Sequence, residues 1–397
     1  MNQDLAKKLF EEGGVLIFLG VPVGTEFGID FKSWNTDERF RGIKMIPPGI
    51  HYIFYSATSS TGDISPRSGF FHNFQRGEIV LRKWDMDKED MSDKLGTDEE
   101  ISNFRHNLKA MDNFLGPYPY DIYEKWINLI ENVTGNLVSQ LIPHSGIVRS
   151  ALELEGCSDA DRPRVDKNGI STSNFKKKKR MRLSSSSAED AEDQLLPIMK
   201  AKSGTALRST EFPEKHYPEG STPSDITQHS LDSSYVLENM ISKYKEPSDI
   251  IGELQFSFIC FLVGHSLEAF EQWKRLINLF CSCEVAITKY RRLYDLLLNT
   301  LKLQVTEIPE EFLADIVSNN NFFYMKVRDL FRNIQSSNVD GNLKSKMNRF
   351  KEYLTETYNW NFEHLEWEED EDAPVVVDIN EYSHQLEEDI TENQSPN

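Results

Sequence analysis

The segment that most resembles a nucleotide-binding loop is Gly20-Val21-Pro22-Val23-Gly24-Thr25, near the start of the chain. A phosphate-binding loop needs Lys and then Ser or Thr after its last glycine, because the lysine reaches the phosphates and the hydroxyl binds magnesium. Here Gly24 is followed by Thr25 and Glu26, which places a carboxylate where phosphate needs a positive charge. We therefore interpret the segment as a turn.

The residues that could bind a metal are Cys260, His265, Cys281 and Cys283. Structural zinc sites usually contain paired C-x₂₋₄-C or H-x₃₋₅-H knuckles, and a C-x-C pair inside a helix points its two thiols apart. Free cysteines are among the residues most often buried. Together with Cys157 the chain has four cysteines, too few for a disulfide framework. We expect core packing and no metal.

Nucleophilic catalysis needs Ser or Cys beside a His that an acid orients, and the chain contains no G-x-S-x-G elbow. His51 and His72 stand in strand-like segments, where histidines are mostly structural. Pairs of carboxylates are abundant mainly in the C-terminal tail, where solvation keeps their pKa values ordinary. We expect no catalytic residue and no cofactor.

A basic run lies in a stretch poor in large apolar residues. It consists of Lys176, Lys177, Lys178, Lys179, Arg180 and Arg182. Runs of this kind serve as nuclear import signals or nucleic-acid patches, and we favour import. Ser184, Ser185, Ser186 and Ser187 follow directly and precede several acids, so they are candidate phosphorylation sites whose phosphates would offset the basic charge.

The C-terminal tail holds most of the net charge. The chain carries −20, and residues 361–397 contain thirteen acids with no Lys or Arg, which leaves −7 for the rest. Within the tail, the run Pro374, Val375, Val376, Val377, Asp378 and Ile379 is typical of a strand. Such a strand can add to a partner's sheet edge or pack on its own domain, and both alternatives remain open.

The elements that position these residues divide the chain into four parts. Strand-like runs at 15–21, 39–46, 50–57, 70–74 and 78–84 are separated by Gly and Pro, which predicts a β-sandwich or barrel-like sheet. Helical periodicity begins at Thr97, which with Glu100 forms a candidate capping box, and continues through 120–141. These elements make a β-rich N-terminal domain, residues 1–155, with a few helices.

Residues 156–215 are expected to be a disordered linker, because they contain too little apolar area to offset the entropy of ordering. Residues 216–365 show repeated i, i+3, i+4, i+7 stripes, such as Phe323, Val327, Leu330 and Ile334, which predict an all-α bundle or superhelix. Residues 366–397 form the acidic tail. The fold class is therefore α+β with more than one domain.

Composition limits the class of protein. Hydrophobic residues make up 39% and aromatic residues 11%, enough for a substantial core. The longest apolar run, 256–263, is shorter than the ~20 residues that span a bilayer, and the charged start lacks a signal peptide. We expect a soluble intracellular protein without membrane binding, and the negative charge argues against coating nucleic acid.

Several longer segments carry a resemblance to a known family. They are Gly24-Thr25-Glu26-Phe27-Gly28-Ile29-Asp30; Gly42-Ile43-Lys44-Met45-Ile46-Pro47-Pro48-Gly49 with His51-Tyr52; Arg67-Ser68-Gly69-Phe70-Phe71; Tyr118-Pro119; Thr222-Pro223-Ser224-Asp225-Ile226-Thr227; Gly252-Glu253-Leu254-Gln255-Phe256; Glu268-Ala269-Phe270-Glu271-Gln272-Trp273-Lys274-Arg275-Leu276; and Ala373-Pro374-Val375-Val376-Val377. In this order they resemble the Aar-two family of splicing factors, which assist maturation of the U5 small nuclear ribonucleoprotein (U5 snRNP).

The resemblance implies a β-rich N-terminal domain followed by a helical domain similar to VHS superhelices, and no catalysis. It implies binding to the large spliceosomal scaffold protein (Prp-eight) at its RNase H-like and Jab/MPN domains, together with U5 snRNP components, and exclusion of the helicase that joins later. Residues 374–379 would be the added strand. The implied location is cytoplasm and nucleus, with no sequence-specific nucleic acid bound directly.

Three further hypotheses remain from the residues. The acidic tail could shield a basic RNA-binding scaffold from RNA, since it imitates phosphate charge. A VHS-like bundle could be a cargo or trafficking adaptor, which would bind membranes or sorting signals. A cryptic zinc- or nucleotide-dependent enzyme would retain zinc or nucleotide on purification.

Overall fold

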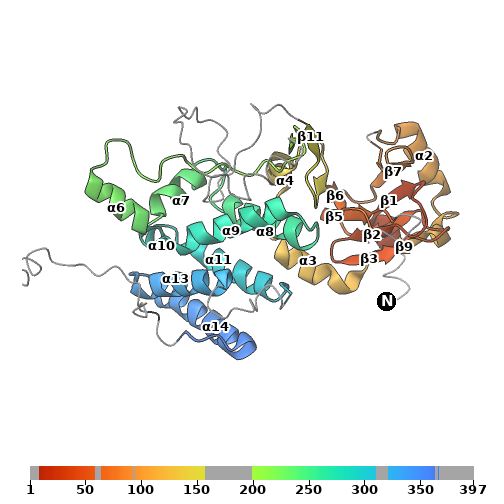
Figure 1. The fold of residues 1–397 in the computed structure, drawn as a ribbon. Coiled ribbons are helices and arrows are strands. Elements are labelled where there is room, and N and C mark those ends of the chain that lie inside the picture. Colours follow the sequence, from red (N-terminus) through yellow and green to blue (C-terminus); the bar gives the residue numbers. More distant parts are fainter. Residues whose placement is uncertain are drawn as a thin grey trace, which may run out of the picture.

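The computed structural model describes residues 9–58, 64–92, 94–156, 199–309, 321–362 and Leu365. We call residues 9–156 the N-terminal unit and residues 199–365 the C-terminal unit. Figure 1 shows the strands of the first unit gathered at one end of the molecule and the helices of the second at the other. This arrangement confirms the predicted α+β layout of a β-rich region followed by a helical region.

Two five-stranded sheets make up the sandwich of the N-terminal unit. The first has the order β8-β7-β1-β4-β9, in which the central β1 runs parallel to β7 and antiparallel to β4. The second has the order β10-β6-β5-β2-β3 and is antiparallel throughout. The strands of the first sheet are β1 (Gly14–Leu19), β4 (Gly42–Ile46), β7 (Ile79–Asp85), β8 (Asp90–Met91) and β9 (Leu115–Pro117); those of the second are β2 (Glu26–Ile29), β3 (Lys32–Asn35), β5 (Gly49–Ser56), β6 (Ser68–Phe74) and β10 (Val148–Arg149).

Side-chain alternation builds the sandwich, because successive residues of a strand point to opposite faces. In β1, Leu16 and Phe18 belong to the core shared by the two sheets, whereas Val15 and Ile17 face away from it. In β5, Ile53 and Tyr55 enter the same shared core. Each sheet therefore also presents an outer apolar face that another element must cover.

The outer face of the first sheet is covered by α2 (Asp98–Asn107). Thr97 and Glu100 form the predicted capping box at its start. The helix packs Ile101 and Phe104 against Val15 and Ile17, yet none of its own residues is fully buried. This side of the sandwich is thus covered by α2 and by Leu108 and Met111 just after it, and all the covering side chains are only partly buried.

The outer face of the second sheet is covered by helices from both units. Tyr52 and Phe54 of β5 join the largest core cluster, which also contains α3 (Tyr123–Leu129), α4 (Gly135–Leu141) and the helices of the C-terminal unit. The two units therefore share one hydrophobic core.

The C-terminal unit is helical, and the predicted stripes form its core. Its helices are α6 (Pro223–Leu231), α7 (Ser234–Ile241), α8 (Asp249–Leu262), α9 (Leu267–Cys281), α10 (Val285–Lys289), α11 (Arg291–Val305), α13 (Phe322–Ser336) and α14 (Gly341–Tyr358). All residues from Ile250 to Phe261 are buried, which makes α8 the central helix. The stripe from Phe323 to Ile334 is the buried face of α13. Within the described residues, the helices fall short of the length and apolarity that crossing a membrane requires.

The expected linker is shorter than its predicted span of 156–215. Strands β11 (Leu154–Gly156) and β12 (Met199–Ala201) pair antiparallel, with Glu155 opposite Lys200. Thr205 is buried, and Leu207 and Phe212 pack against the shared core. Residues 199–212 therefore belong to the folded structure, because long-range contacts bury apolar side chains that sequence composition alone does not reveal. Residues 157–198 lie outside the described part.

Candidate interaction surfaces and the joint between the units

The predicted site residues lie outside the described part of the chain. This applies to the basic run 176–182, the serines 184–187 and the strand candidate 374–379. Nothing in the structure places them, and they remain predictions. The described residues instead reveal four polar arrangements, and each of them fixes one segment of the fold to another.

The three described cysteines are in the core rather than at a surface. Cys260, Cys281 and Cys283 are buried and unpaired. Burial raises the pKa of Cys283 to about 12 and the pKa of Cys281 well above its usual value, so both are uncharged thiols at neutral pH. Among the described residues, no group of three or more His, Cys, Asp or Glu could hold a metal ion.

A buried pair, Asp30 and His51, is the arrangement closest to acid–base chemistry. His51 Nδ1 lies 2.8 Å from Asp30 Oδ2, and Nε2 lies 2.9 Å from the Pro47 carbonyl oxygen, so Nε2 carries a proton. The Tyr118 hydroxyl donates to the same Asp30 oxygen at 2.6 Å. Burial, and then the Asp30 charge, raise the pKa of Tyr118. All these side chains are buried, so the arrangement holds the turn after β2, where Asp30 has φ of 55°, against β5.

Arg67 joins the two units at the end of α8. Its Nη2 donates to both carboxylate oxygens of Glu26, at 2.8 and 3.0 Å, and its guanidinium lies 4.4 Å from the Phe54 ring centroid. Its Nη1 donates to the carbonyl oxygen of Val263 at 2.8 Å and lies 3.2 Å from His265 Nε2. Val263 is the C-cap of α8, so this cation satisfies a terminal carbonyl of the central helix.

Close backbone approaches complete this joint. The Phe71 and Phe256 rings stack with centroids 5.0 Å apart across the two units. A Cβ on Gly252 would lie 2.4 Å from the Asn132 carbonyl oxygen, so only glycine allows α8 to come this close. About one helical turn further along α8, the Gln255 side chain accepts a hydrogen bond from the Asn132 backbone N–H at 2.8 Å.

Glu253 anchors the segment that follows the linker. The carboxylate is fully buried and accepts four hydrogen bonds, two of them from the N–H and hydroxyl of Thr210 at 3.0 and 2.6 Å. Tyr244 and Gln272 each donate one more, both at 2.7 Å. A buried carboxylate is tolerated only when its oxygens are satisfied in this way. Glu253 therefore holds residues near Thr210 on α8 and α9.

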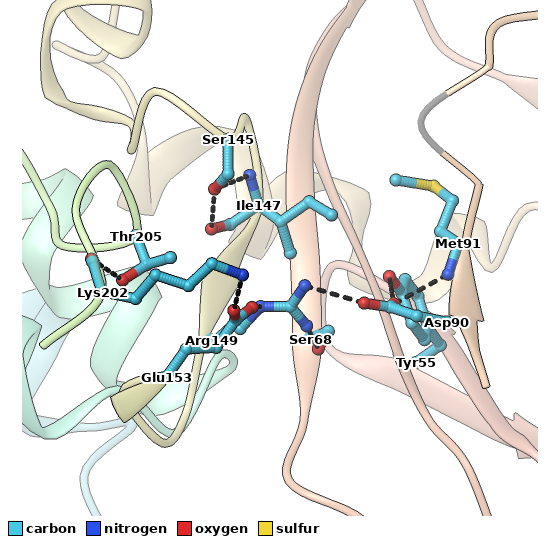
Figure 2. A network of polar contacts seen from close by, with 10 residues as sticks. All are labelled: Tyr55, Ser68, Asp90, Met91, Ser145, Ile147, Arg149, Glu153, Lys202 and Thr205. Atoms are coloured by element: carbon cyan, nitrogen blue, oxygen red, sulfur yellow. Dashed lines mark hydrogen bonds and ion pairs between the residues drawn. The ribbon is translucent and has the colours of Figure 1, made fainter. Parts of the chain in front are cut away.

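A chain of ion pairs around Arg149 fixes the two ends of the linker, as Figure 2 shows. Arg149 lies 2.7 Å from Asp90 and 2.6 Å from Glu153, and it donates to Ser68 at 2.8 Å. Lys202, just after β12, pairs with Glu153 at 2.8 Å. The Lys202 hydrogen bond and the charges of Arg149 and Lys202 outweigh burial, which acts in the opposite direction, and leave the pKa of Glu153 below its usual range. The network ties the β11–β12 ribbon to the sandwich.

Sequence reasoning did not single out these anchoring residues. The sequence marks four of them only as members of the segments that carry the family resemblance, namely Arg67, Phe71, Gly252 and Glu253. A lone arginine or glutamate gives no local sign of burial, since its partners lie up to 198 positions away in the sequence. The motifs that carried the family resemblance nevertheless contain the residues that join the units.

Comparison with known proteins covers nearly the whole chain. Residues 12–143 match the family model described as the AAR2 N-terminal domain, and residues 210–363 match the AAR2 C-terminal repeat region. The chain is 39% identical over 392 residues to the Protein AAR2 homolog of Homo sapiens, covering 96% of this chain and 97% of that protein.

More distant relatives match with similar coverage. The Protein AAR2 homolog of Caenorhabditis elegans is 33% identical over 90% of this chain and 97% of its own length. The A1 cistron-splicing factor AAR2 of Saccharomyces cerevisiae is 24% identical over 91% and 96%. Identity above 30% along almost the full length, together with both family regions in order, means that this chain belongs to the AAR2 family.

Proposed function

We propose that this chain is a pre-mRNA splicing factor that acts by binding rather than by catalysis. The observation that carries the proposal is the full-length similarity to AAR2 proteins, one of which is named a splicing factor. Within the described residues, the side chains best suited to acid–base chemistry are Asp30, His51 and Glu253. All three are buried, and their hydrogen bonds hold segments of the fold together. That use favours an interaction protein.

The partner in this proposal is the large spliceosomal scaffold protein, bound at its RNase H-like and Jab/MPN domains during U5 snRNP assembly. A body whose two units share a core offers a rigid surface to such a partner. Residues 374–379 add a strand to a sheet of the scaffold, and the bound factor excludes the later helicase. The basic run 176–182 serves import, so the protein occurs in cytoplasm and nucleus.

The test is a reconstitution with the full chain and the two purified scaffold domains. We expect a stable complex, and loss of most of the affinity when residues 373–397 are deleted. Val376→Pro should weaken binding because it removes a backbone N–H from the added strand, whereas Val376→Thr should not. Absence of a complex with either domain would refute the partner. Equal binding by Val376→Pro and Val376→Thr would refute strand addition alone.

A further inference from the structure

A groove between α11 and α14 has a composition unlike the rest of this acidic protein. The two helices run parallel, since Arg291 at the start of α11 pairs with the α14 N-cap Asp340 and Lys302 near the end of α11 lies over the Tyr353 ring. Two cavities open along the line between them, of about 350 and 130 Å³. The larger lies at the helix starts, and the smaller lies between Lys302 and Phe350.

Basic side chains outnumber acidic ones along this groove. Its lining includes five cations and two carboxylates, namely Arg291, Arg292, Lys302, Lys346 and Arg349 against Asp295 and Asp340. The carboxylates are already paired, Asp340 with Arg291 at 2.6 Å and Asp295 with Lys346 at 2.5 Å.

Three cations of the groove therefore lack a carboxylate among the described residues. Arg292, Lys302 and Arg349 are exposed; Lys302 lies 5.2 Å from the Tyr353 ring centroid, and Arg349 Nε donates weakly to the Ser345 carbonyl oxygen at 3.4 Å. Leu298 and Phe350 form an apolar floor beneath them. The groove thus fits an extended acidic segment with room for an apolar side chain.

The chain itself supplies such a segment next to the groove. Residues 366–372 read Glu-Trp-Glu-Glu-Asp-Glu-Asp, six acids in seven positions. The described chain ends near the groove, because the Phe362 ring lies 5.2 Å from Phe331, which lies 5.7 Å from the groove residue Phe350. Seven extended residues reach about 24 Å, enough to cross the width of one helix.

We propose that residues 366–372 bind the α11–α14 groove of the same molecule, with their carboxylates on Arg292, Lys302 and Arg349. The tail is then a built-in competitor for any acidic ligand of this groove. Because the tethered segment begins within a few residues of its site, its effective concentration is in the millimolar range. The inference is independent of which protein the chain binds.

The experiment uses full-length protein and a fluorescent peptide of residues 363–375. A tail-neutral variant carries E366Q, E368Q, E369Q, D370N, E371Q and D372N. We expect the peptide to bind this variant at least about tenfold more tightly than it binds the wild type, whose own tail occupies the groove. Raising the salt concentration should weaken the binding, since exposed charges are screened.

Charge reversals in the tail-neutral variant test whether the peptide binds in the α11–α14 groove. Adding Lys302→Glu and Arg349→Glu should lower the affinity for the peptide about tenfold. Adding Lys109→Glu and Lys245→Glu makes the same charge change elsewhere and should leave the affinity unchanged. Unchanged thermal unfolding midpoints show that the variants are folded. Equal peptide binding by wild type and tail-neutral protein would overturn the proposal, and so would equal weakening by the two charge reversals.

Discussion

The two outer faces of the β-sandwich are covered in different ways. The first sheet is closed by α2, a ten-residue helix without a fully buried residue. The second sheet is closed by α3, α4 and α8, and the last of these is buried from Ile250 to Phe261. The second cover therefore combines two helices of the N-terminal unit with the central helix of the C-terminal unit.

A boundary between two regions of the sequence is therefore not a boundary in the hydrophobic core. The sheet face bearing Tyr52 and Phe54 is completed by helices more than a hundred residues later. The N-terminal unit by itself would expose the part of this face that the C-terminal helices cover, whereas its α2 side would be unchanged. We therefore expect changes to the cover of the second sheet to lower stability much more than changes to the cover of the first sheet.

The largest effect is expected from separating the units. Residues 1–156 expressed alone should fail to fold cooperatively, because the Tyr52 side of the sheet and Trp126 lose their cover. Near-ultraviolet circular dichroism and denaturant unfolding measure this. Co-expression with residues 199–397 should restore a soluble complex. A cooperative, monomeric 1–156 fragment would show that the shared core is not needed for folding.

Removing one aromatic ring from the cover of each sheet compares how much the two covers contribute to stability. Phe256→Ala removes the partner of Phe71 and leaves a buried cavity, so we expect the free energy of unfolding to fall by about 3–5 kcal/mol. Phe104→Ala on the half-buried face of α2 should cost about 1 kcal/mol. Urea unfolding gives both values. Equal losses would mean that the two covers contribute alike.

The anchor of the helical cover is tested at Glu253. Glu253→Ala leaves the donors from Thr210, Tyr244 and Gln272 without their acceptor, and we expect a loss of about 3 kcal/mol. Glu253→Gln keeps one acceptor oxygen and should lose less. Urea unfolding compares the two variants, and hydrogen exchange near Thr210 reports release of the segment. Unchanged exchange there in Glu253→Ala would refute the anchoring role.

A smaller and pH-dependent effect is expected at the Arg67 joint. Burial, and then the Arg67 charge, lower the pKa of His265 in the folded protein below its ordinary value near 6.5. The unfolded chain then binds more protons below about pH 6.5, so this contribution is present above that pH and is lost as the pH falls through the lowered value. Since His265 is partly exposed, the effect is about half a kcal/mol.

Thermal unfolding between pH 7.5 and 5 measures the His265 effect. The variant His265→Asn lacks the titrating ring and should lose less stability than the wild type over this range. Glu26, on the other side of Arg67, is unchanged in both proteins and so cancels in the comparison. Parallel stability curves for the two proteins would contradict the prediction.

The smallest effect is expected from removing the middle of the linker. Gly156 and Met199 are opposite residues of the β11–β12 ribbon, so residues 157–198 can be replaced by a flexible Gly/Ser linker of about thirty residues. The free energy of unfolding should change by only about 0.3 kcal/mol, because the closure entropy of a loop changes with the logarithm of its length. A larger loss in denaturant unfolding would mean that the removed residues contribute to the fold.

Local pattern predicted most elements but not how they associate. The strand expected at 50–57 is β5 (Gly49–Ser56), and the helix expected after Thr97 is α2. Strand β3 was missed because all four of its residues are exposed, so it has no apolar alternation. The turn at Pro47-Pro48-Gly49 joins β4 and β5 of different sheets, which periodicity cannot distinguish from a hairpin.

The anchoring residues could not be predicted for a related reason. Arg67 and Val263 meet although they are 196 positions apart, and Glu253 receives its donors from three separate segments. Burial of a charge depends on these distant partners and not on its neighbours in sequence. The family resemblance indicated the segments that contain Arg67 and Glu253, and only the structure shows what these two side chains contact.

The ribbon of β11 and β12 brings together the two residues that flank positions 157–198, since Gly156 lies opposite Met199. Both strands are held by the Arg149 network, so the chain is closed at this point by the described residues alone. The entropy of closing a chain segment grows only with the logarithm of its length, so inserting or removing a few residues between positions 157 and 198 should cost little stability. New chain termini placed between these positions, with residue 397 linked to residue 1, should give a circular permutant that folds, because the base of the ribbon stays intact.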